Sequence, residues 1–325
     1  MQGLIVKSSG SAYGVLLQDG TAVEAHVKGN FRIKGIRSTN PVAVGDRVVV
    51  EQLPDGTNWI TDIQDRRNYI IRRATNLSKQ SHILAANVDQ VALIVTVNHP
   101  KTSTTFIDRF LATCEAYRVP AALIVNKIDL YDEDDNAELE YLRLLYKEIG
   151  YPVYAISATK LNVPRENRSS GVQEFRSSDI SSDGLLAFLA GKTTLLSGNS
   201  GVGKSTLLNA LFGEEKTRTG VISDAHDRGM HTTTFSEMYF LSPDTAVIDT
   251  PGIKGFGTFD MQREEVGHYF KEIFLTSKDC RFGNCTHTNE PDCAVRVAVE
   301  NARIAPSRYE SYLSLLGDCN ESKYR

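Results

Sequence analysis

Residues 198–205, with the sequence Gly-Asn-Ser-Gly-Val-Gly-Lys-Ser, constrain the fold of this chain more than any other segment. An apolar run over residues 193–197 leads into them, and a helical pattern over residues 204–212 leads away. In such a loop the glycines let backbone amides approach phosphate groups, Lys204 neutralises the terminal phosphates, and the Ser205 hydroxyl faces a magnesium ion. A glycine-rich loop with a purely structural role would not need the Lys-Ser pair. The sequence therefore predicts a phosphate-binding α/β domain.

Three further motifs suit the same kind of site, but they stand in an unusual order. Asn-Lys-Ile-Asp at residues 126–129 and Ser-Ala at residues 157–158 precede the phosphate loop, and Asp-Thr-Pro-Gly at residues 249–252 follows it. In an ordinary GTPase the phosphate loop comes first. Because a nucleotide site is assembled from several loops at one sheet edge, moving the chain ends to another exposed loop preserves the site. The order predicts a circularly permuted GTPase domain.

The motif at residues 126–129 fits the recognition of guanine. An apolar strand pattern over residues 121–125 precedes it, which places the Asp129 carboxylate at a strand end. There it can accept hydrogen bonds from the ring and exocyclic N–H groups of guanine, whereas adenine has no donors in that arrangement. The Lys127 stem can cover the base, and the Ser-Ala pair can offer a backbone amide to the base oxygen. A solvated turn is the alternative interpretation.

The Asp249 motif and the polar segment before it are expected to contact the terminal phosphate and its magnesium ion. Asp249 can hold magnesium through water, and the Gly252 amide can contact the phosphate. Residues 217–234 are polar and end in Met-His-Thr-Thr-Thr. A threonine hydroxyl there completes the magnesium shell only while the terminal phosphate is present, so this loop is expected to order with GTP and loosen with GDP. Thr233 is the preferred ligand, and its two threonine neighbours are alternatives.

The residue after Gly252 bears on the rate of hydrolysis. Many GTPases carry a glutamine there that orients the attacking water, but Ile253 cannot do so. Intrinsic hydrolysis is therefore expected to be slow and to need another residue or a partner. His231 is the internal candidate, because an imidazole can orient or deprotonate water near neutral pH. A histidine that only packs or orders the loop is the alternative.

These arguments define the predicted nucleotide site. The predicted GTP-binding residues are Asn126, Lys127, Asp129, Ser157, Ala158, Gly198, Asn199, Ser200, Gly201, Val202, Gly203, Lys204, Ser205, Thr206, Asp249 and Gly252. The predicted magnesium ligands are Ser205, Thr233 and Asp249, and the predicted catalytic residues are His231, Lys204 and Thr233.

Near the end of the chain, Cys280, Cys285, His287 and Cys293 have the residue types and close spacing of a tetrahedral zinc site. Three thiolates and one imidazole leave no open coordination position. One zinc ion is therefore expected to be structural, to hold the tail together, and to take no part in catalysis. Four incidental residues are the alternative.

The chain of 325 residues is long enough for two or three domains. Residues 1–66 alternate apolar and polar side chains between turns, which predicts a small antiparallel barrel of the OB or the SH3-like type. Residues 67–258 contain apolar strands separated by amphipathic helices, which predicts a GTPase domain with a mostly parallel sheet. Residues 259–325 are predicted to be a helical zinc-binding domain, with helices near residues 263–274, 294–302 and 306–316. Residues 161–183 are predicted to be an inserted loop.

Composition limits the partners. The net charge of −4 gives no global sign of nucleic-acid binding, so a polyanion surface would have to be local. Residues 65–73 together with Lys79 form a basic strip that either tracks RNA phosphates or is a solvated linker. No apolar run approaches the roughly 18 residues of a membrane span, so no membrane partner and a cytoplasmic location are expected.

Together these features resemble the RsgA family of GTPases, also called YjeQ or YloQ. The resemblance rests on the barrel, the permuted order NKID, SA, GNSGVGKS, HTTT and DTPG, and the tail CRFGNCTHTNEPDCAV followed by Arg-Tyr-Glu-Ser-Tyr-Leu at residues 308–313. It implies an OB-fold barrel, zinc, magnesium with GTP, and weak GTP hydrolysis that the small ribosomal subunit stimulates during its late maturation. It also implies rRNA as a partner and a switch histidine at His231, and we expect a monomer. Met230, where a basic residue is expected, and the longer segment 161–183 depart from the family pattern.

A different class of function is a GTP-dependent RNA-binding switch module, or a metal-handling protein, in which hydrolysis is incidental. The closed set of four zinc ligands argues against metal delivery. Ile253 keeps the idea of a slow switch open.

Overall fold

The computed structural model describes residues 1–9, 12–27, 41–73, 81–161, 182–212, 236–250 and 261–321. At the N-terminus, five strands form a closed barrel: β1 (Gln2–Ser8), β2 (Ala12–Leu17), β3 (Ala22–Val27), β4 (Arg47–Gln52) and β5 (Asn58–Ile63). The strand order is β1-β2-β3-β5-β4, and β4 returns to pair with β1. Because β3 and β5 pair in parallel while their neighbours are antiparallel, the barrel is of the OB-like type, which periodicity alone could not decide.

The central domain contains a parallel sheet, as predicted from the alternation of strands and helices. Its strands run in the order β10 (Val153–Ala155), β9 (Ala121–Val125), β8 (Gln90–Val95), β11 (Thr193–Gly198) and β13 (Thr245–Asp249), all parallel. An antiparallel strand, β12 (Glu237–Ser242), pairs with β13, as expected for these residues.

Helices cover both faces of this sheet. The face that carries Val91 and Leu93 packs under α1 (Thr104–Ala116) and α2 (Glu133–Ile149). The face that carries Ala92 and Ile94 packs under α3 (Ser182–Leu189) and α4 (Lys204–Phe212). Since neighbouring residues of β8 point to opposite faces, both faces are apolar and the strand is buried throughout. The predicted loop 161–183 lies largely outside the described residues, and its last two residues already belong to α3.

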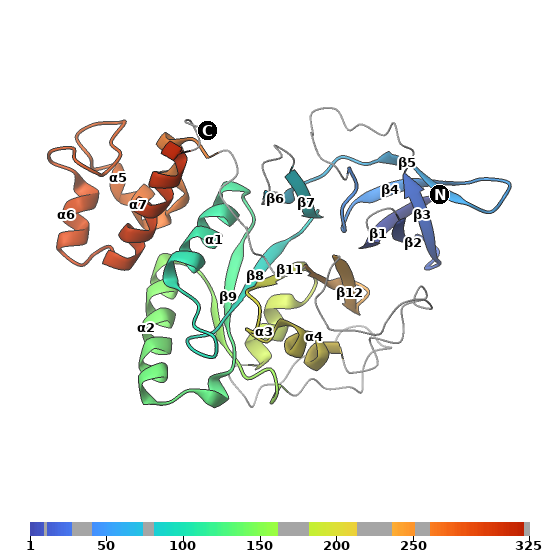
Figure 1. Cartoon of the computed structure of the whole chain (residues 1–325), viewed down its shortest axis with the longest axis horizontal. Helices are drawn as coiled ribbons and strands as arrows, with labels where there is room; N and C mark the ends of the chain where they lie inside the picture. Colours follow the sequence, from blue (N-terminus) through green and yellow to red (C-terminus); the bar gives the residue numbers. More distant parts are fainter. Residues whose placement is uncertain are drawn as a thin grey trace.

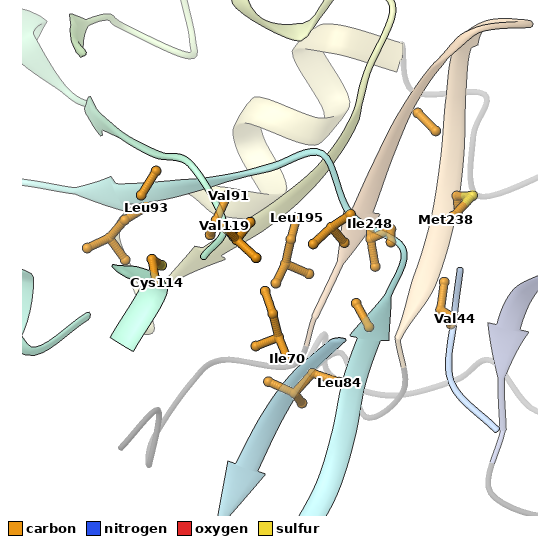
Figure 2. Packing of buried hydrophobic residues seen from close by; sticks show 14 of the residues in the cluster. Val44, Ile70, Leu84, Val91, Leu93, Cys114, Val119, Leu195, Met238 and Ile248 are labelled. Atoms are coloured by element: carbon orange, nitrogen blue, oxygen red, sulfur yellow. The ribbon is translucent and has the colours of Figure 1, made fainter. Parts of the chain in front are cut away.

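The barrel and the central sheet are one continuous structure. β1 pairs antiparallel with β12, with Lys7 opposite Glu237, so the sheet continues from the central domain into the barrel. A separate two-stranded sheet, formed by β6 (Tyr69–Arg73) and β7 (Ser81–Ala86), lies between the barrel and the central sheet. Figure 2 shows the shared core, in which Val44 of the barrel, Ile70 and Leu84 lie near Leu195 and Ile248 of the central sheet.

For Arg66, both interpretations of the basic strip, an RNA-contacting residue and a solvated linker residue, are wrong. Its guanidinium is buried at the end of the barrel, where Nε and Nη2 each donate to an Asp46 carboxylate oxygen over 2.6 Å. Neighbouring Arg67 is exposed and pairs with Asp89 at 2.7 Å. Arg66 is therefore neither a solvated linker residue nor free to contact phosphate, and for the rest of the strip both interpretations stay predictions. Lys79 lies outside the described residues.

The tail forms a separate helical unit beside α1, drawn in red in Figure 1. It contains a 3₁₀ helix (Arg263–Tyr269), α5 (Lys271–Ser277), α6 (Ala294–Glu300) and α7 (Pro306–Glu321). The single helix predicted near residues 263–274 is wrong, because the chain breaks at Phe270, whose backbone is extended and whose ring is buried against Tyr312. Tertiary packing overrides the local helical pattern there. We call residues 261–321 the zinc unit.

Candidate functional site

The order of strands locates the site. In the central sheet the strand order reverses between β8 and β11, which makes their carboxyl ends a topological switch point. Ligands of open α/β sheets bind in the crevice at such a point. The phosphate loop leaves β11 there, and residues 96–103 leave β8 beside it. These two segments lie close together. A Cβ atom on Gly198 would be 2.8 Å from the Ile94 oxygen, and one on Gly201 would be 3.4 Å from Pro100.

Gly203 shows why the phosphate loop needs glycine. Its φ of +92° lies in the left-handed region, and a Cβ on it would collide with the Asn126 Nδ2 atom. The loop then enters α4 at Lys204, which is buried, whereas Ser205 and Thr206 are exposed in the first turn. Asn199 and Ser200 complete the loop between them and β11. This arrangement leaves backbone amides and the Ser205 hydroxyl on the side where phosphates would bind.

Asn126 joins three loops of the site. Its buried side chain donates from Nδ2 to the Val202 oxygen over 2.9 Å, and its Oδ1 accepts from the Ala158 amide over 2.9 Å. It therefore connects the guanine motif, the phosphate loop and the Ser-Ala loop through its two hydrogen bonds. The Ala158 amide can reach a base oxygen only by sharing or exchanging this hydrogen bond.

Lys127 and Asp129 stand at the edge expected for the base. Lys127 has a left-handed backbone, and its Nζ donates to the His99 oxygen over 2.5 Å. The Asp129 carboxylate is exposed, and a hydrogen bond from the Ser157 hydroxyl lowers its pKa; burial opposes this shift and the Lys160 ammonium adds to it. Asp129 is thus held ionised, which is the state that accepts two N–H groups of guanine.

Lys204 and Asp249 meet where the terminal phosphates and magnesium are expected. The Lys204 ammonium forms a buried ion pair with the Asp249 carboxylate and donates to the Thr250 oxygen over 2.8 Å. Thr250 in turn donates to the Leu196 oxygen of β11 over 3.1 Å. Since Asp249 is the partner of this ammonium group, magnesium and phosphate would take over part of the ion pair when nucleotide binds.

Tyr131 supports the site and was not predicted. Its hydroxyl donates to the Asn126 oxygen over 2.7 Å and accepts from the Val97 amide over 2.9 Å, so it ties the loop after β8 to the loop after β9. Nearby, the Thr102 hydroxyl accepts from the Thr96 amide. Both partners of Tyr131 are backbone atoms, and no residue type marks such partners in a sequence. Only its position just after the guanine motif could have drawn attention to it.

Several predicted residues lie outside the described part of the chain. These are His231, Thr232, Thr233, Thr234, Met230, Gly252 and Ile253.

The four predicted zinc ligands come together in the zinc unit. Their ligand atoms all lie within 4.8 Å of one another, with His287 Nδ1 3.6 Å from Cys280 Sγ and 3.5 Å from Cys293 Sγ. Zn–S bonds of about 2.3 Å in a tetrahedron require ligand separations of about 3.8 Å. Burial also lowers the pKa of His287, which keeps the imidazole neutral for metal binding. The cluster of Cys280, Cys285, His287 and Cys293 therefore has the ligand types and the spacing to hold one zinc ion.

Glu290 organises the loop between two of these ligands. Burial opposes its charge, but hydrogen bonds from the Thr286 hydroxyl and amide and from the Thr288 amide outweigh burial and lower its pKa to about 2. Such supporting contacts fix the direction of metal ligands.

Similarity to known proteins agrees with this geometry. Residues 63–259 match the model of the RsgA GTPase family, and residues 2–60 match the model of the RsgA N-terminal domain. The chain belongs to the RsgA family of GTPases. The chain is 59% identical over 325 residues to a protein of Phocaeicola vulgatus named small ribosomal subunit biogenesis GTPase RsgA, with 100% of this chain and 99% of the relative covered. A protein of the same name from Porphyromonas gingivalis is 54% identical over 330 residues, with coverage of 100% and 99%.

Two solved structures have the same architecture. YjeQ from Thermotoga maritima matches with a TM-score of 0.73 and 31% identity, covering 98% of each chain. YloQ, described as a circularly permuted GTPase, matches with a TM-score of 0.66 and 28% identity, covering 100% of this chain and 96% of the other.

This chain is accordingly a GTP hydrolase with a circularly permuted domain, and its family uses magnesium with GTP. Among the helices that the structure describes, none combines the length and the apolar character needed to span a membrane.

Proposed function

We propose that this GTPase binds the small ribosomal subunit and assists its late maturation, with hydrolysis of GTP to GDP and phosphate stimulated by the subunit. The observation that carries the proposal is the end-to-end similarity to relatives named small ribosomal subunit biogenesis GTPase, at identities up to 59%. The residues gathered at the β8–β11 switch point, which suit a guanine nucleotide, support it. We also propose that the chain acts as a monomer in the cytoplasm.

Within the nucleotide site, each residue has a proposed role. Asp129 accepts the guanine N–H groups, Lys127 covers the base, and the backbone of residues 198–206 cradles the phosphates. Lys204 neutralises the transferred phosphoryl group. Ser205, Thr233 and Asp249 hold magnesium, and the Gly252 amide contacts the terminal phosphate. These roles agree with the positions of the described residues among them.

His231 is the proposed catalytic residue that orients or deprotonates the attacking water, because Ile253 cannot. Substituting His231→Ala should depress stimulated GTP turnover while leaving GTP affinity unchanged. A parallel loss of affinity and turnover would make the histidine a loop-ordering residue.

The three proposed units divide nucleotide binding and rRNA binding between them. The GTPase domain, residues 67–258, binds nucleotide. The barrel, residues 1–66, and the zinc domain, residues 259–325, contact rRNA of the small subunit from opposite ends of the molecule, where Figure 1 places them. GTP would fix residues 217–234 and thereby the way in which both units face the subunit, and hydrolysis would permit release.

Turnover of GTP with and without purified small subunits tests this function. We expect stimulation by the subunits, and tighter subunit binding with a nonhydrolysable GTP analogue than with GDP. Equal binding with both nucleotides and unchanged turnover would contradict the proposal. Nucleotide-dependent binding without any stimulation would instead support the alternative, an RNA-binding switch module in which hydrolysis is incidental.

A further inference from the structure

Helix α7 contacts the zinc-binding loop through two tyrosines. Tyr309 donates from its hydroxyl to the His287 oxygen over 2.5 Å, and Tyr312 donates to the Thr286 oxygen over 2.7 Å. The ring of Tyr312 also lies 6.1 Å from the His287 ring, centroid to centroid. The backbone that presents one zinc ligand is therefore held by this helix. The position of the loop depends on the position of α7.

The same helix contacts the GTPase domain through Arg308. This arginine is 1% exposed, and its Nη1 lies 2.7 Å from Oδ1 of Asp108, a fully buried residue of α1. Its Nε and Nη2 donate to the two carboxylate oxygens of Glu272 in α5, over 2.6 and 3.1 Å. Asp108 accepts a second hydrogen bond from the Tyr146 hydroxyl of α2 over 2.7 Å. One guanidinium thus joins α7, α5 and the GTPase helices.

The geometry of this contact permits one orientation of the zinc unit. A guanidinium presents its donors in a rigid fork, and a buried charge without its partner is strongly unfavourable. Arg308 can pair with Oδ1 of Asp108 and with both oxygens of Glu272 at once only when α7 lies as it does against α1. Two ion pairs nearer the surface also hold the zinc unit against α1. Arg109 pairs with Asp318 at 2.8 Å, and Lys271 pairs with Glu115 at 3.0 Å.

Helix α1 leads from this contact to the edge that binds the base. Its N-cap is Ser103, the last residue of the loop that follows β8. That loop supplies the His99 oxygen to Lys127 and the Val97 amide to Tyr131. A shift of α1 along its axis would therefore move contacts of the guanine motif. The zinc loop, α7, α1 and this loop form one continuous series of packed elements.

We propose that Arg308 is a positioning residue that couples the zinc-binding loop to the guanine-binding edge, so that zinc occupancy and nucleotide affinity depend on each other. Thermodynamic linkage requires this dependence to be mutual. The proposal rests on nucleotide binding as described under the proposed function and adds a regulatory input to that site. It needs no ribosomal subunit, so a failure of subunit stimulation would leave it standing.

The test measures the affinity of the full-length protein for GDP with zinc bound and after removal of zinc by a chelator. We expect the two affinities to differ by about fivefold or more in the natural sequence. In Arg308→Met, with zinc content near one per chain, the ratio should approach one. Bound GDP should also slow the loss of zinc to the chelator in the natural sequence and not in the variant. Arg303→Met, at an exposed arginine of the same unit, is the matched control and should keep the full effect.

Second variants separate positioning from folding. Asp108→Asn removes the other half of the contact and should abolish the coupling in the same way, while Arg308→Lys keeps the charge without the fork and should retain part of it. An unchanged GDP affinity on zinc removal, or full coupling in Arg308→Met, would overturn the proposal. So would loss of zinc from both Arg308→Met and Asp108→Asn, because Arg308 would then only stabilise the fold of the zinc unit.

Discussion

The barrel and the zinc unit are attached to the GTPase domain by different physical means. The barrel continues the central sheet through β1 and β12, and its buried Val44 belongs to the same apolar core as Ile248. The zinc unit has a separate core around Phe270, which takes in only Ala112 of α1 among the buried residues of the GTPase helices, and it also meets α1 through charged contacts, of which Arg308 with Asp108 is buried. Backbone pairing and apolar burial make the barrel part of the GTPase fold. The zinc unit is joined to the GTPase domain by side-chain contacts, several of them charged, so we expect it to be separable, with its internal order depending on its own small core and on the metal.

Zinc removal should have the largest effect and should affect only one of the two regions. Structural zinc contributes on the order of 10 kcal/mol to the folding of small metal-binding units. Chelation, or Cys293→Ala, should therefore abolish hydrogen-exchange protection in residues 261–321 while the barrel and the central sheet stay protected. Cys319→Ser, at a cysteine of the same unit outside the ligand set, should keep zinc and protection. Loss of protection in the barrel at the same time would show that the two junctions are not different in kind.

Within the barrel, Asp46→Asn should cause the next largest loss. Asp46 is fully buried, accepts two hydrogen bonds from Arg66 and a third from the Ala43 amide. Removing its charge leaves a buried guanidinium without a counterion, which costs about 3–5 kcal/mol in the free energy of unfolding. Because the barrel shares the central core, urea unfolding should show one transition at lower denaturant for both. Asp62→Asn, at an exposed position of β5, should change stability little. Separate transitions for barrel and sheet would contradict the shared core.

The site was predictable from sequence where chemistry fixes residue types at short spacing. The Lys-Ser pair after a glycine-rich loop, the Asn-Lys-x-Asp motif, and three cysteines with one histidine each specify a ligand within a few residues. The parallel sheet was predictable for a related reason, because continuous apolar strands alternate with amphipathic helices. The predicted roles of His231 and Thr233 stay predictions.

The buried ion pairs of the barrel and of the zinc-unit junction were not predictable, because their partners are far apart in the chain. Arg66 resembled the other residues of a basic strip, and only the fold brings Asp46 to it. Arg308 and Asp108 are 200 residues apart, and no local pattern marks Asp108 among the polar residues of α1. The break at Phe270 has the same origin, since packing against Tyr312 outweighs the helical propensity of the segment.

Gly45→Ala should sharpen the contrast by testing how closely the barrel must approach. Gly45 has a φ of +93°, and a Cβ there would collide with the Ala86 oxygen of β7. The left-handed backbone costs about 1–2 kcal/mol for a residue with a side chain, and the collision adds a displacement of β7. We expect a total loss of about 2–4 kcal/mol by urea unfolding. Gly56→Ala is the matched control, because its φ is +86° and its Cβ would meet no atom within 4 Å. Equal losses in both variants would mean that the close approach contributes nothing.

The smallest effect should come from an ion pair that spans the barrel junction between β1 and β12. Lys7 Nζ lies 3.5 Å from Glu237, and about a third of each side chain is exposed, at 32% and 31%. Water and salt screen such a pair, so a double-mutant cycle of Lys7→Ala and Glu237→Ala should give a coupling of about 0–1 kcal/mol that decreases at high salt. The backbone hydrogen bond from the Ser8 amide to the Ser236 oxygen remains in every variant. A coupling of several kcal/mol would make the barrel junction electrostatic as well, and the distinction between the two regions would then lie in burial and not in the kind of contact.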